Sequence, residues 1–124
     1  MADHTQTTAP TTLAPAIADD LHTLATALLG DVMATLEQFP ESRLNSSFPG
    51  YGNTAYTLGF HLLGSAAYWI GEVVGHQPTE RVRAEEFGSS GTLNDLRERY
   101  RDTLGRVERT FAAFSEDNLK PTSD

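Results

Sequence analysis

The chain of 124 residues contains no cysteine, which excludes disulfides, thiol nucleophiles and thiolate metal sites. It also lacks an apolar run of the roughly 18 residues that a membrane span needs, because His61 and Glu72 interrupt the most apolar segment. The first fifteen residues have neither a basic segment nor a continuous apolar segment, so we expect no secretory signal. The sequence therefore predicts one cytoplasmic domain with one hydrophobic core.

Basic residues are scarce in the first two thirds of the chain. Residues 1–80 hold eight acidic residues and a single base, Arg43. Residues 81–124 hold eight bases and nine acids, which alternate along the sequence, and the net charge of the chain is −8. A nucleic-acid surface needs a stripe of positive charge, whereas alternating charges are typical of a solvated helix face. The charge pattern therefore argues against nucleic acid as a direct ligand.

Apolar residues recur at intervals of three and four over residues 16–39, and this spacing predicts a first long helix. The predicted stripe contains Ile17, Leu21, Leu24, Leu28, Val32 and Leu36, and it is widened by Ala25 and Leu29. Pro40 is expected to end the helix, because a residue that precedes proline disfavours helical dihedral angles. Residues 1–15 are predicted to be a flexible tail, and residues 41–52 a loop with a turn at Pro49–Gly50.

The second predicted helix covers residues 54–74, with Asn53 as its cap. It contains Gly59, Gly64 and Gly71, and each glycine costs up to about 1 kcal/mol relative to alanine in a free helix. We expect the reason for keeping them to be close approach of neighbouring elements, in a helix at the centre of a bundle. Gly75 occupies the expected C′ position.

The third predicted helix covers residues 92–115, with Thr92 as its cap and Asp95 three residues later. Its apolar positions run from Leu93 to Phe114 in steps of three and four, and residues 116–124 are predicted to be a tail. The prediction is therefore an all-α domain of three main helices over residues 16–115. The connection of about sixteen residues before the third helix is long enough for the second and third helices to run parallel.

His61 is the residue of the second helix that is best suited to binding a metal or taking part in a reaction. A lone histidine on an apolar helix face is more often a hydrogen-bonded core residue than a ligand, and a metal site normally needs three convergent side chains. His22, which flanks the stripe of the first helix, is the only other candidate ligand for a shared metal, although an exposed position is the simpler interpretation. Ser65 lies one turn after His61, and Tyr68 and Trp69 are candidates to line a small pocket beside it.

The run NTAYTLGFHLLGSAAYWIGEVV resembles the second helix of the DinB-like superfamily, where a histidine is followed by small, apolar and aromatic residues. The order of a long helix, this helix, an extended crossover and an amphipathic third helix is also similar, over roughly residues 16–115. The resemblance implies an up-down-down-up bundle of four helices that is usually dimeric. It also implies, for many members, a divalent metal held by a histidine of the second helix and an HxxxH pair of the last helix. Several such proteins are transferases that use bacillithiol or mycothiol, or related hydrolases and isomerases.

Only His61 matches the three histidines of that superfamily, because no histidine follows His76 in this sequence. The resemblance therefore implies a protein of metal-dependent enzyme ancestry with an incomplete site for nickel, zinc or iron at His61. With the fourth helix missing, an apolar groove would be left open, so we expect a homodimer or another partner that supplies the missing wall. The alternative interpretation is a non-catalytic helical module that dimerises or binds a small ligand between its helices.

Overall fold

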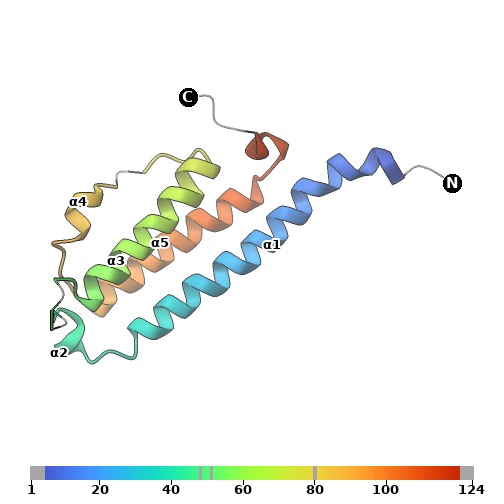
Figure 1. The fold of residues 1–124 in the computed structure, drawn as a ribbon. Coiled ribbons are helices and arrows are strands. Elements are labelled where there is room, and N and C mark those ends of the chain that lie inside the picture. Colours follow the sequence, from blue (N-terminus) through green and yellow to red (C-terminus); the bar gives the residue numbers. More distant parts are fainter. Residues whose placement is uncertain (1–4, 48, 51, 80, 121–124) are drawn as a thin grey trace.

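The computed structural model describes residues 5–47, 49–50, 52–79 and 81–120 of the chain. Within these ranges the backbone is helical, without strands apart from one isolated bridge between Ser47 and Thr54, which confirms the all-α class. The elements are α1 (Thr5–Leu36), α2 (Glu41–Leu44), α3 (Ala55–Ala66), the π-helix η1 (Ala67–Val74), α4 (Arg83–Glu86), α5 (Leu93–Ala112) and the 3-10 helix η2 (Glu116–Leu119) (Figure 1). None of the helices in these ranges is both long and apolar enough to cross a membrane.

The helices α1 and α5 run in opposite directions against each other. Near the end of α1, the Glu37 carboxylate accepts a hydrogen bond from Arg97 Nε near the start of α5, at 2.9 Å. Toward the other end of the pair, the ring of His22 stacks on the ring of Phe111, with centroids 5.9 Å apart. Residue numbers therefore fall along α1 as they rise along α5, as Figure 1 also shows.

In contrast, α3 with its continuation η1 runs in the same direction as α5 (Figure 1). Arg99 Nε donates a hydrogen bond to the carbonyl oxygen of Phe60 at 3.1 Å, and Thr103 Oγ1 donates to the carbonyl oxygen of Leu63 at 3.2 Å. The residue numbers of the two elements thus rise together. The parallel arrangement requires the chain to return along the full length of the pair between residues 76 and 91, and α4 is a single turn within that return.

Several helix boundaries differ from the sequence prediction. Helix α1 begins at Thr5 rather than at residue 16, and it ends at Leu36 rather than at residue 39. The predicted loop 41–52 contains the short helix α2. Thr54, rather than Asn53, caps α3, because its hydroxyl accepts a hydrogen bond from the backbone N–H of Thr57 at 3.0 Å. The predicted cap of the third helix is confirmed: Thr92 and Asp95 form a reciprocal capping box.

Helix α1 carries two apolar stripes side by side, and only one of them is covered. Leu29, Met33 and Leu36 are buried in the core against α3 and α5. Leu24 and Leu28, which the sequence placed in the same core-facing stripe, are 54 % and 55 % exposed. The stripe read from the sequence is therefore wider than the contact that α3 and α5 make with this helix.

The glycines of the second helix confirm the expected close approaches at two positions. A Cβ atom on Gly59 would lie 2.6 Å from a methyl group of Leu36 in α1, and a Cβ atom on Gly64 would collide with side chains from α4 and α5. At the end of η1, a Cβ atom on Gly75 would collide with the Thr110 hydroxyl. His76, with φ of 58°, adopts the left-handed C′ conformation that was predicted at Gly75. Gly75 is thus explained by packing rather than by its backbone angles.

Candidate functional site

A buried carboxylate, Glu86, lies at the meeting point of α3, α4 and α5. It is 1 % exposed, and among the described residues it is the only charged residue that is buried. Glu86 ends the short helix α4, where the Ser89 hydroxyl donates to its carbonyl oxygen at 2.6 Å. The Ser89 carbonyl oxygen in turn accepts a hydrogen bond from the Thr57 hydroxyl in the first turn of α3. These contacts hold the crossover against α3 and direct the carboxylate inward.

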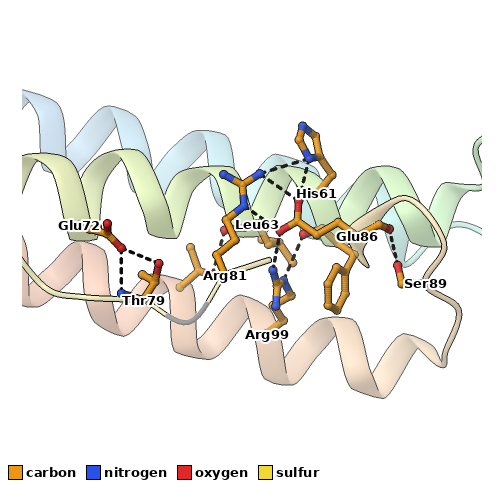
Figure 2. Close-up of polar contacts among 10 residues, drawn as sticks. His61, Leu63, Glu72, Thr79, Arg81, Glu86, Ser89 and Arg99 are labelled. Atoms are coloured by element: carbon orange, nitrogen blue, oxygen red, sulfur yellow. Dashed lines mark hydrogen bonds and ion pairs between the residues drawn. The ribbon is translucent and has the colours of Figure 1, made fainter. Parts of the chain in front are cut away.

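Three side chains from three parts of the chain converge on the Glu86 carboxylate (Figure 2). Arg81 binds it with two parallel hydrogen bonds, from Nε at 2.8 Å and from Nη2 at 2.9 Å. Arg99 Nη2 donates to the same carboxylate from α5 at 3.1 Å, and His61 Nδ1 lies 2.9 Å from Oε1. A fork of two bonds from one arginine is among the strongest side-chain pairings in proteins. We name Glu86, His61, Arg81 and Arg99 the Glu86 cluster.

The hydrogen-bond geometry fixes the role of one imidazole nitrogen of His61. A carboxylate only accepts hydrogen bonds, so Nδ1–H of His61 is the donor to Glu86 Oε1. Arg81 Nη2 lies 3.3 Å from the same Nδ1, but both atoms are then donors, so no hydrogen bond forms between them. The other ring nitrogen, Nε2, points away from the cluster in Figure 2. His61 is therefore anchored at Nδ1, and its Nε2 has no hydrogen-bond partner among the residues that the structure describes.

The charges around Glu86 decide its protonation state. Burial by itself raises the pKa of the Glu86 carboxyl, but the hydrogen bonds from Arg81 and His61 and the charges of Arg81 and Arg99 outweigh burial. The resulting pKa lies below that of an ordinary glutamate. Glu86 is therefore ionised at neutral pH, and the desolvation of a buried charge is offset by three partners.

Arg99 also depends on its surroundings, because burial lowers the pKa of its guanidinium despite the nearby Glu86 carboxylate. Its guanidinium lies over the ring of Phe60 at 3.7 Å, and its Nε donates to the Phe60 carbonyl oxygen. Gly64 makes room for this arrangement, since a Cβ atom there would collide with the Glu86 carboxylate and with Arg99 Nη2. A glycine in the middle of a helix is thus required by a buried ion pair.

A pocket of about 540 Å³ opens beside the cluster. One side of it is formed by η1, which continues α3 as a π-helix of eight residues. Such π-helical segments are rare and often occur at functional sites. The pocket is lined by His61, Ser65, Tyr68, Trp69, Glu72, Thr79, Arg81 and Arg83. The structure thus brings four residues singled out from the sequence, His61, Ser65, Tyr68 and Trp69, to one cavity.

Glu72 and Thr79 hold the start of the crossover against the π-helix (Figure 2). Glu72 Oε1 accepts hydrogen bonds from the Thr79 backbone N–H at 2.9 Å and from its hydroxyl at 2.7 Å. The hydrogen bond from the Thr79 side chain, followed by the one from its backbone, lowers the pKa of Glu72. Glu72 therefore contributes a negative charge to the edge of the pocket.

The structure places His22 far from His61. His22 packs on Phe111, whereas Arg99, which shares the Glu86 carboxylate with His61, lies twelve residues earlier on α5. Twelve residues correspond to about 18 Å along a helix. Within the ranges that the structure describes, no group of three or more histidine, aspartate or glutamate side chains is placed to hold a metal ion. The described residues of one chain therefore do not fit the metal centre that the resemblance implies.

No pattern in the sequence singles out Glu86, Arg81 or Arg99. In the sequence, Glu86 is one of two adjacent acids in a charged connection, and Arg99 is one of several bases in an alternating helix. Only Gly64, in the middle of a helix, indicated that something approaches closely at that point.

No family model matches the chain, and no curated protein or solved structure matches it either.

Ser65 lines the same pocket as His61, but no hydrogen bond joins the two side chains among the described contacts. What the arrangement provides is a fixed imidazole with one open nitrogen, fixed guanidinium groups and an aromatic wall. These groups are suited to binding and orienting a small molecule.

Proposed function

We propose that this chain is a helical association module that pairs with a second copy of itself through the uncovered stripe of α1 and the adjoining stripe of α3. We name this surface the leucine face, and it comprises Leu21, Leu24, Leu28, Leu58 and Leu62. The observation that supports the proposal is an apolar groove of about 440 Å³ between α1 and α3, lined by Leu28, Leu58 and Leu62 together with neighbouring apolar side chains. A soluble monomer rarely leaves a continuous apolar face of this length in water.

The character of the leucine face favours a second copy as the occupant. Asp31 is the only charged residue that lines the groove in the described part of the chain, so the covering surface has to be largely apolar. Copies of a chain with net charge −8 repel one another elsewhere, but this face is nearly uncharged. A two-fold axis along the face pairs it with an identical face, which satisfies both copies at once.

Such a dimer supplies the wall that a fourth helix forms in an up-down-down-up bundle. Helices α1 and α3 of the two copies then form a four-helix layer with one shared core. We therefore propose that the chain is related to the DinB-like superfamily as an association module that descends from metal-dependent enzymes. Because the described residues do not fit a metal centre within one chain, metal-dependent thiol chemistry at His61 is not part of the proposal.

Replacing Leu62 with glutamate tests the proposal. The side chain is 49 % exposed in the single chain, so the substitution leaves the fold of the monomer intact but places two carboxylates in the dimer seam. We expect the wild-type protein to sediment at micromolar concentration with twice the mass of the 13.5 kDa chain. We expect Leu62→Glu to raise the dissociation constant at least about 100-fold, which corresponds to roughly 2.7 kcal/mol.

Leu119→Glu is the matched control, because Leu119 is similarly exposed but lies on η2, outside the leucine face. This variant is expected to remain dimeric. A wild-type protein that sediments as a monomer, or a control that dissociates as readily as Leu62→Glu, would contradict the proposal. If the chain sediments in a heavier species together with a different protein, that protein, and not a second copy of the chain, covers the leucine face.

A further inference from the structure

The pocket beside the Glu86 cluster has the dimensions and the mixed lining of a small-molecule site. Its volume of about 540 Å³ lies within the range of roughly 300–1,000 Å³ that is typical of such sites. It is separate from the leucine face, because the two lining sets share no residue. Self-association through the leucine face therefore does not explain the size and the mixed lining of this pocket.

One wall of the pocket is aromatic and unusually open. The rings of Tyr68 and Trp69 meet edge to face with centroids 5.1 Å apart, and both belong to the π-helix η1. Trp69 is the only tryptophan of the chain and is 58 % exposed. An indole at the edge of a cavity offers a large flat surface and one N–H donor to a ligand ring.

Another side of the pocket carries guanidinium groups. Arg81 is held in place by its two bonds to Glu86, and its guanidinium also lies 5.8 Å from the centre of the Tyr68 ring. The Arg83 guanidinium lies 6.0 Å from the centre of the Phe87 ring and is exposed. A guanidinium fixed in one plane retains donors for a second acceptor, and arginine forks match carboxylate and phosphate oxygens.

The balance of donors and acceptors in the described lining favours an anionic ligand. Arg81, Arg83, Ser65 and the aromatic side chains supply hydrogen-bond donors. Among the lining residues that the structure describes, Glu72 is the only carboxylate, and one of its oxygens already accepts two hydrogen bonds from Thr79. His61 Nε2 adds a fixed hydrogen-bonding position, because Glu86 holds the other nitrogen.

We propose that this pocket binds a small molecule in which a flat ring is joined to an oxyanion, either a carboxylate or a phosphate monoester. The ring lies against Trp69, and the oxyanion lies between Arg81 and Arg83. The side chain of His61 orients the ligand through its open nitrogen. The site belongs to one chain and does not depend on the proposed self-association.

Trp69 supplies a direct readout, because its fluorescence reports on this pocket alone in a chain with one tryptophan. Benzoate, phenyl phosphate, inorganic phosphate and benzylamine are titrated into the intact protein at a fixed protein concentration. We expect saturable quenching or a spectral shift with benzoate or phenyl phosphate, and at least about tenfold weaker binding of benzylamine and of inorganic phosphate, a difference of roughly 1.4 kcal/mol. Whichever of benzoate and phenyl phosphate binds more tightly shows whether the preferred oxyanion is a carboxylate or a phosphate monoester.

Arg83→Gln is the test variant, since Arg83 is exposed and lies outside the Glu86 cluster. It is expected to weaken binding of the preferred probe at least tenfold, whereas Arg109→Gln, which removes another exposed arginine, on α5 and outside the pocket lining, is expected to change the affinity less than twofold. Binding is also expected to persist in Leu62→Glu, which separates this proposal from self-association. The proposal fails if no anionic probe saturates by about 10 mM, if benzylamine binds as well, or if the two arginine variants behave alike.

Discussion

Glu86→Ala is expected to lower the free energy of unfolding by about 3–5 kcal/mol, the range found when one partner of a buried ion pair is removed. Glu86 is 1 % exposed and accepts hydrogen bonds from Arg81, Arg99 and His61. Without it, two guanidinium groups remain in a partly desolvated site with no negative charge of the cluster to offset them. Urea-induced unfolding, followed by far-ultraviolet circular dichroism at pH 7, measures the change.

Glu85→Ala is the control for this substitution. Glu85 precedes Glu86 on the same short helix but is exposed, and its removal is expected to change the free energy of unfolding by less than about 0.5 kcal/mol. If both variants lose less than about 1 kcal/mol, the Glu86 cluster contributes little to folding and does not hold the crossover against α3.

Gly64→Ala is expected to be the second strongly destabilising change, by about 3 kcal/mol. Alanine normally stabilises a helix by up to about 1 kcal/mol relative to glycine, so the expected sign is opposite to that of helix propensity. The new Cβ atom would collide with the Glu86 carboxylate and with Arg99 Nη2, so the methyl group and the ion pair cannot occupy their positions together. Overpacking in a rigid interior typically costs 1–3 kcal/mol, and displacement of the ion pair adds to it.

Gly71→Ala provides the matched comparison on the same continuous helical segment. A Cβ atom there would approach no closer than 3.5 Å to the side chain of Arg106, which is ordinary van der Waals contact. We expect this variant to be neutral or slightly stabilised in thermal unfolding. Equal melting temperatures for the two alanine variants would show that α4 and α5 do not approach Gly64 as closely as described.

The helical class of the chain could be predicted because local patterns dictate it. The apolar spacing of α5 and the capping box at Thr92 depend only on neighbours within a few residues, and both appear in the structure, although α5 ends at Ala112 rather than at residue 115. The close approaches at Gly59 and Gly64 could also be anticipated, because glycine within a helix needs a compensating reason.

The Glu86 cluster could not be predicted, because it depends on contacts between distant parts of the chain. Arg81 and Glu86 lie five residues apart, but Arg99 and His61 reach the carboxylate from other helices, and no local pattern marks which charges become buried. The wide apolar surface of α1 posed a similar problem. The sequence shows that Leu24 and Leu28 are apolar, but it does not show that α3 and α5 leave them uncovered.

Glu86 is an ionised anchor that holds His61 and Arg81 beside the pocket. Its carboxyl carbon can be followed by carbon-13 NMR as the pH is lowered from 7. We predict a titration midpoint below the ordinary glutamate pKa of about 4.3. The stability that Glu86 contributes is then fully present above that unfolded-state pKa and is lost as the pH falls through the lower folded-state pKa. A midpoint above about 4.3 would mean that burial outweighs the arginines and His61, so that the Glu86 cluster does not stabilise the ionised carboxylate.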